Sequence, residues 1–239
     1  MWAKLSETFS VFFRRLPLFA AIALSIWLPV NLATEKMIRL FHLGDFWVYV
    51  WGGLIFGPIV SAATVDVLDR LERGQPAGYL DAMDTAVSVW LTLMLTSLMA
   101  MILSALGFVF LIIPGILLMI FFTFVTAVVV VEGLGGMAAL ARSARLTAGR
   151  RWKIFGANLI LVLLMLLVFA PVTVVMELTG TIDGFGPSVA FDCLTDLYAI
   201  LFTILNFLFY WDARVEEESA KHPKQFLYIE PLPQEPRDA

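Results

Sequence analysis

Apolar side chains fill residues 85–131 of this chain without a single charged residue. A continuous helix of this length would extend roughly 70 Å at about 1.5 Å per residue, whereas the hydrocarbon core of a bilayer is roughly 30 Å thick. The segment must therefore fold back on itself. Because proline removes a helical hydrogen bond and glycine tolerates a turn, we expect the hairpin turn at Pro114 and Gly115.

Apolar runs of spanning length recur along the rest of the chain, separated by polar loops. They predict six transmembrane helices, at residues 16–34, 46–66, 86–111, 115–132, 154–177 and 192–211. The predicted fold is therefore all-α: a polytopic membrane protein whose six transmembrane helices form three hairpins.

A weak internal repeat adds a leader to each hairpin. The segments 5–19, 80–94 and 140–154 overlay on one another, and each begins with a short amphipathic stretch that leads into an odd-numbered span. We expect these leaders to be short interfacial amphipathic helices. Apolar residues of the third leader share one side of a helical wheel: Met137, Leu140, Ala141 and Ala144. Arg142 faces away from them, Arg145 lies at the edge, and Leu146 departs from the pattern.

Basic residues divide the loops into two groups. Of the 16 Lys and Arg residues, all but Lys36 and Arg39 lie before the first span, after the second, after the fourth or near the C-terminus. Basic loops stay on the cytoplasmic side, so both termini are predicted to be cytoplasmic. Residues 1–214 would form the transmembrane domain. Residues 215–239 contain four prolines and few apolar side chains, and we expect a disordered cytoplasmic tail there.

Composition agrees with a membrane location, since 60% of the residues are hydrophobic and only 15% are charged. Soluble domains contain about 50% apolar and about 25% charged residues. The single cysteine, Cys193, excludes an intramolecular disulfide and any CxxC metal or redox site, and we expect a buried thiol there.

Ionisable residues offer little for catalysis. A metal-dependent phosphodiesterase needs clustered carboxylates and histidines, but His42 and His222 are predicted on opposite sides of the membrane. We expect no catalytic residue, metal or cofactor.

The external acids are Glu177, Asp183, Asp192 and Asp196. They have two interpretations: a site for a divalent cation or cationic partner, or solvated residues of which Asp192 and Asp196 favour a helix N-terminus. We favour the second.

Five basic residues are candidate contacts for anionic lipid headgroups: Arg142, Arg145, Arg150, Arg151 and Lys153. The same residues would also satisfy the topology rule without lipid specificity.

Gly53, Gly57 and Ser61 form a small-residue stripe for close helix packing, either within the monomer, which we favour, or in a dimer.

Polar residues within spans or at their ends are expected to form hydrogen bonds or ion pairs with one another. We expect Asn158 and Asn206 to hydrogen-bond between spans five and six. At the end of the second span, Asp66 with Arg70 and Asp69 with Arg73 have the spacing of helical ion pairs. Aromatic residues at span ends are expected in the headgroup region: Trp47, Tyr49, Trp51, Tyr210 and Trp211.

Four motifs carry a family resemblance: LIIPGI at 111–116, VEG at 131–133, SARLTAGR at 143–150 and YWDAR at 210–214. In their order and spacing, the chain resembles the bacterial inner-membrane family that includes YciC and the membrane domain of glycerophosphoryl diester phosphodiesterases. The resemblance implies the fold and a place in the bacterial inner membrane. The family's catalytic name belongs to fusions with a separate soluble domain, so the resemblance implies no catalytic residue here.

Two classes of function fit this pattern. Pumps and proton-coupled carriers usually hold ionisable residues deep in the membrane, and every predicted span lacks a charge in its central part. We therefore expect a non-enzymatic protein that organises membrane lipids or partner membrane proteins, as an accessory subunit or envelope-maintenance factor. The alternative is a transporter or lipid-translocating protein, since a passive route needs only grooves and uncharged polar groups. We expect no nucleic-acid partner, and the sequence does not set the oligomeric state.

Overall fold

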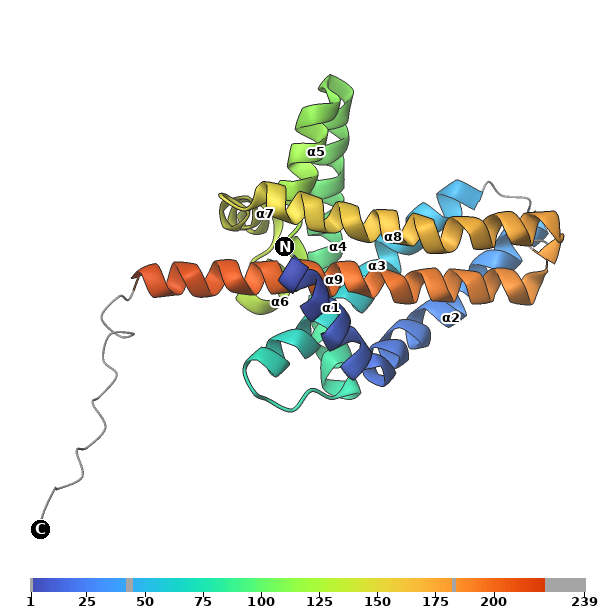
Figure 1. The fold of residues 1–239 in the computed structure, drawn as a ribbon, viewed down its shortest axis with the longest axis horizontal. Coiled ribbons are helices and arrows are strands. Elements are labelled where there is room, and N and C mark those ends of the chain that lie inside the picture. The colour runs from blue at the N-terminus through green and yellow to red at the C-terminus, as the bar shows by residue number, and fades with distance from the viewer. Residues whose placement is uncertain (1, 42–44, 182–183, 222–239) are drawn as a thin grey trace, which may run out of the picture.

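The computed structural model describes residues 2–41, 45–181 and 184–221, and these residues are helical with short connections (Figure 1). The helices are α1 (Trp2–Arg14), α2 (Leu16–Phe41), α3 (Asp45–Glu72), α4 (Tyr79–Phe110), α5 (Ile112–Phe121), α6 (Val125–Glu132), α7 (Gly136–Leu146), α8 (Arg151–Leu178) and α9 (Phe185–Lys221).

Six stretches of the described chain are long and apolar enough to cross a membrane: Leu16–Leu40, Val48–Glu72, Tyr79–Phe110, Ile112–Glu132, Arg151–Leu178 and Phe185–Lys221. The fourth stretch consists of α5 and α6, which are separate helices. The described part of the chain contains no strand. The all-α polytopic fold predicted from the sequence is therefore confirmed.

The three hairpins pair α2 with α3, α4 with α5, and α8 with α9. They do not run parallel to one another, because the hairpin of α4 and α5 crosses the direction of α8 and α9 (Figure 1). Helix α9 contacts α1, α2, α3, α7 and α8, and its Ile204, Leu205 and Tyr210 are completely buried. By contrast, only three residues of α8 are buried. The packing core thus gathers around α9, and most of the surface of α8 is left uncovered by the other described helices.

The turn between α4 and α5 lies at Leu111, where the backbone is extended (φ −167°, ψ 148°). The prediction of a turn at Pro114 and Gly115 is therefore wrong by three residues. Pro114 falls in the first turn of α5. N–H groups in the first turn of a helix have no intrahelical acceptor, so the missing N–H of proline costs no hydrogen bond there.

Gly115 instead serves the packing of the hairpin. A Cβ atom at Gly115 would lie 2.5 Å from ring carbons of Phe108, and one at Gly107 would lie 3.0 Å from the Cα of Gly115. The absence of side chains at Gly107 and Gly115 therefore allows α4 and α5 to approach closely.

Two of the three predicted leaders are separate helices, α1 before α2 and α7 before α8. The second is not, because α4 is continuous from Tyr79. Helix α7 packs on the protein through a side that differs from the predicted apolar side, whose place in the membrane interface stays a prediction. Its buried residues are Ala139, Leu140, Ser143 and Leu146, whereas Met137 is 62% exposed. Helix α7 packs on the protein through the side that includes Leu146.

Helix α9 extends further than the predicted sixth span at both ends. Residues 215–221 are helical, with ion pairs from Arg214 to Glu218 at 3.0 Å and from Lys221 to Glu217 at 2.7 Å. The prediction of a disordered tail is wrong for these seven residues. Its remainder, 222–239, lies outside the described residues.

Several predicted pairs are confirmed. Asn158 Nδ2 donates to Asn206 Oδ1 at 2.9 Å, which joins α8 to α9. Arg70 lies 2.7 Å from Asp66, and Arg73 lies 2.8 Å from Asp69. Cys193 is buried with a reduced thiol, as expected.

Candidate functional site

A reversal of the chain between α6 and α7 brings charged residues together at one end of the molecule. Helix α6 ends at Glu132, and Gly133 caps it in the left-handed conformation (φ 67°), which glycine adopts without strain. Helix α7 then returns alongside, so that Arg142 lies next to Glu132. Arg142 Nε donates to Glu132 Oε2 at 2.7 Å.

The Arg142 and Glu132 pair is extended by two residues of α9. Arg142 Nη1 donates to Glu217 Oε2 at 2.5 Å, and the Tyr210 hydroxyl donates to Glu132 Oε1 at 3.1 Å. The side chains of Arg142 and Glu132 are only 14% and 15% exposed. Tyr210 is completely buried, so its predicted place among the lipid headgroups is wrong.

Two further ion pairs attach neighbouring segments to α9. Lys4 Nζ of α1 lies 3.0 Å from both Asp212 and Glu7. Arg150, just before α8, pairs with Glu216. We call the whole set the ionic junction; it consists of Lys4, Glu132, Arg142, Arg150, Tyr210, Asp212, Glu216 and Glu217.

The electrostatics of the ionic junction favour the charged forms of Arg142 and Lys4. Hydrogen bonding to Glu132 is the largest influence on Arg142 and, with the bond to Glu217, raises its pKa despite burial. For Lys4, burial is the largest influence and lowers the pKa, but the combined hydrogen bonds to Asp212 and Glu7 outweigh it, so the pKa is raised above 10.5. Paired charges of this kind fix helices in place, and removing one partner leaves the other uncompensated.

Ser143 of α7 stabilises the break between α5 and α6. Its hydroxyl donates to the Phe121 carbonyl at 2.6 Å and accepts from the Phe124 N–H at 3.1 Å. Both backbone groups lie at helix ends, where they lack intrahelical partners. Three motifs of the family resemblance thus meet here, through Glu132, Ser143 and Tyr210.

The five candidate lipid contacts occupy different environments. Arg142 and Arg150 are paired within the ionic junction, and the Arg151 guanidinium lies 4.2 Å from the ring centroid of Phe121. Arg145 and Lys153 are exposed. Lipid contact therefore remains a prediction that suits Arg145 and Lys153 best.

At the opposite end, α2, α3 and α9 form a second polar cluster. Asn31 Nδ2 donates to Asp196 Oδ2 at 2.8 Å, and Tyr49 donates to Asp192 Oδ2 at 3.0 Å. Asp192 and Asp196 lie in the second and third turns of α9, which begins at Phe185 and has no acid in its first turn. The prediction that they favour a helix N-terminus is wrong, because hydrogen bonds to α2 and α3 hold them instead.

Within the described ranges, no group of three or more His, Cys, Asp or Glu residues could hold a metal ion. Glu177 is exposed near the end of α8. Three residues considered for such chemistry lie outside the described residues: His42, Asp183 and His222.

Two residues of the small-residue stripe of α3, Gly53 and Gly57, face open space. A Cβ atom at Gly53 or Gly57 would meet nothing within 4 Å, so the favoured packing inside the monomer is wrong for both glycines. The Ser61 hydroxyl donates to the Pro58 carbonyl of its own helix at 3.2 Å. Packing of this stripe against a second copy remains a prediction.

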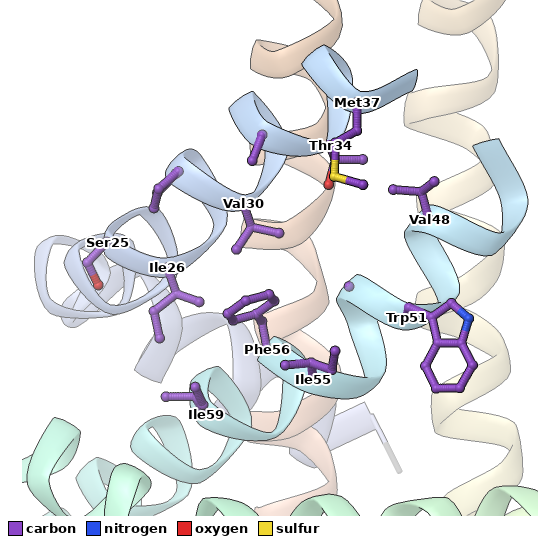
Figure 2. Close-up of a pocket in the computed structure, with 13 residues that line it drawn as sticks. Ser25, Ile26, Val30, Thr34, Met37, Val48, Trp51, Ile55, Phe56 and Ile59 are labelled. Atoms are coloured by element: carbon purple, nitrogen blue, oxygen red, sulfur yellow. The ribbon is translucent and has the colours of Figure 1, made fainter. Parts of the chain in front are cut away.

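An apolar groove of about 820 Å³, which the sequence did not reveal, separates α2 from α3. Phe56 of α3 points toward Ile26 and Val30 of α2, and Val48, Thr34 and Met37 lie at its other end (Figure 2). Pro29 lies inside α2 and Pro58 inside α3, and a proline inside a helix tends to bend it, but a proline does not by itself locate a groove.

A family model described as a domain of unknown function (DUF7847) matches residues 77–210, from just before α4 to Tyr210 of α9. No curated protein and no solved structure matches the chain.

Proposed function

The chain belongs to the DUF7847 family of unknown function, and we propose that it is a non-enzymatic integral protein of the bacterial inner membrane that organises lipids or partner proteins. It would act as an accessory subunit or an envelope-maintenance factor. The similarity to the YciC-like family remains part of this proposal, as does the cytoplasmic location of both termini.

The ionic junction is the observation that carries the proposal. Its cations pair with carboxylates on neighbouring helices, as Arg142 does with Glu132 and Glu217, and Lys4 does with Asp212. These charges fix α1, α6, α7 and α9 relative to one another. A rigid end of this kind supports a role in holding lipids or proteins in place.

Exposed residues beside the ionic junction suit contact with the membrane surface. Trp152 is 77% exposed next to Arg151, and Lys153 is exposed on the same turn of α8. Tryptophan prefers the membrane interface, and each basic residue near an anionic surface contributes about 1 kcal/mol. Lys153 and Arg145 would therefore attract anionic headgroups.

The apolar groove between α2 and α3 favours the alternative, a lipid-translocating protein. Its apolar lining would accept an acyl chain, as lipid translocation requires. The ionic junction argues for the organising role, because its charged groups are engaged with one another at one end of the helices.

Extraction of the tagged full chain from native membranes into polymer nanodiscs would test the proposal. We expect either one stoichiometric protein partner or an enrichment of anionic lipids over the bulk membrane. The double variant Arg145→Glu and Lys153→Glu should reduce the lipid enrichment, whereas the charge-conserving control Arg145→Lys and Lys153→Arg should not. A bulk lipid composition with no stoichiometric partner would contradict the proposal.

A further inference from the structure

The groove between α2 and α3 has the chemistry of an acyl-chain site. Both helices belong to stretches apolar enough to cross a membrane, so the groove lies where lipid tails lie. Apart from the side chains of Ser25 and Thr34, its lining is apolar. The Ser25 hydroxyl donates to the Ile22 carbonyl of its own helix at 3.0 Å. An apolar lining with few polar groups selects an apolar occupant.

Small residues leave the groove empty of the protein's own side chains. Gly52 lies on its wall, and a Cβ atom there would meet only Val30 Cγ1, at 3.9 Å. Pro29 of α2 also lines the groove, and a proline inside a helix tends to bend it. The volume of about 820 Å³ falls in the range of about 300–1,000 Å³ that small-ligand sites occupy.

The length of the groove matches one leaflet. Its lining on α2 runs from Ser25 to Met37, a distance of about 18 Å at about 1.5 Å per residue. Half of the hydrocarbon core of a bilayer is about 15 Å. One extended lipid chain would therefore fill the groove from the membrane midplane to the headgroup level.

A lysine lies at the headgroup end. Lys36 is exposed, three residues after Ala33 and seven after Pro29, which places it close to the groove side of α2. Arg39 is engaged with Glu35 at 2.5 Å, whereas Lys36 makes no ion pair within the described residues. The lysine stem lies along apolar surface while its ammonium group reaches the interface, where it complements a phosphate.

We propose that the groove between α2 and α3 binds one acyl chain of a membrane phospholipid, with the lipid phosphate at Lys36. This inference rests on the proposal that the protein organises lipids. It adds a lipid-binding site at a distance from the ionic junction.

The test uses the purified full chain in nanodiscs that contain phosphatidylglycerol with a diazirine in the middle of one acyl chain. After photolysis, mass spectrometry compares labelling of residues 25–59 with labelling of Leu163 and Leu167, which are exposed residues of α8. We expect the groove to be labelled above this reference level, because a bound chain stays longer than bulk lipid.

Matched glycine variants separate the groove from its surroundings. Gly52→Phe fills the groove, so the excess labelling should be lost while labelling of α8 stays unchanged. Gly53→Phe, one residue along and facing open space, should keep the excess. Ile26→Gln adds an amide without bulk and provides a second test if the phenylalanine variant fails to fold.

Lys36→Gln should weaken labelling about fivefold, equivalent to losing a contact of about 1 kcal/mol.

Groove labelling at the α8 level, or equal effects of Gly52→Phe and Gly53→Phe, would overturn the inference. Neither result changes which partner proteins or lipids are recovered with the chain from native membranes, and the proposed function is tested by that recovery. Conversely, a failure of that recovery would leave the labelling pattern in nanodiscs unchanged.

Discussion

Arg142 Nε lies 2.7 Å from Glu132 Oε2, and this contact joins the middle of α7 to the end of α6. The same guanidinium reaches Glu217 of α9, four residues after Ala213, the last buried hydrophobic residue of that helix within the described chain. A single arginine therefore links two consecutive helices, α6 and α7, to α9, which is distant in sequence.

Removing this arginine should destabilise the protein strongly. In Arg142→Gln, the largely buried carboxylate of Glu132 loses its cation, and we expect a loss of about 3 kcal/mol in the free energy of unfolding. Denaturation in detergent micelles, followed by circular dichroism, would measure it. Arg145→Gln, on the exposed side of the same helix, should change stability by less than about 0.5 kcal/mol.

The double variant Arg142→Gln with Glu132→Gln provides a control. Neutralising both partners removes the uncompensated charge, so part of the lost stability should return. Equal effects of Arg142→Gln and Arg145→Gln would show that the ionic junction does not hold the helices.

The close approach of α4 and α5 makes a second prediction. Glycine to alanine inside a helix usually stabilises by about 0.5–1 kcal/mol. Gly107→Ala should do the opposite and cost about 1–3 kcal/mol, because the new methyl group would lie 3.0 Å from the Cα of Gly115. Gly53→Ala, which faces open space, should follow the usual trend. The same denaturation measurement separates them, and stabilisation by Gly107→Ala would refute the close packing.

Hydrogen bonding between Asn158 and Asn206 should contribute modestly. Interhelical hydrogen bonds in membrane proteins average about 0.6 kcal/mol, so a double-mutant cycle of Asn158→Leu and Asn206→Leu should give a coupling energy near that value. Strictly additive single effects would show that the two amides do not interact.

Topology has its own experiment. Reporter fusions after Gly133 and Gly184 should place the first in the cytoplasm and the second outside, as the distribution of basic residues predicts. Alkaline phosphatase should then be active only after Gly184, and a fluorescent protein only after Gly133. An external Gly133 would invert the predicted orientation.

The sequence was sufficient for the number of spans, because long apolar runs have one stable arrangement in a bilayer. It was also sufficient for Asn158 with Asn206, where two polar residues within spans had few other partners. Local ion pairs such as Asp66 with Arg70 followed from helical spacing alone.

The remaining features depend on packing between distant segments. Lys4 and Asp212 meet only because α1 lies against α9, and no local pattern relates them. Gly115 looked like a turn residue, but the turn lies at Leu111 and the glycine serves close contact with Gly107. The apolar groove was likewise invisible, because a missing side chain such as that of Gly52 creates space only beside a particular neighbour.

Lipid flux in liposomes tests the proposed function most directly. The purified chain is reconstituted with an NBD-labelled phospholipid, and dithionite reduction reports whether labelled lipid crosses the bilayer; release of trapped carboxyfluorescein reports solute flux. We expect both rates to equal those of protein-free liposomes, as an organising protein requires. Lipid or dye flux above that level would contradict the account, and lipid flux abolished by Gly52→Phe but not by Gly53→Phe would establish the translocating alternative.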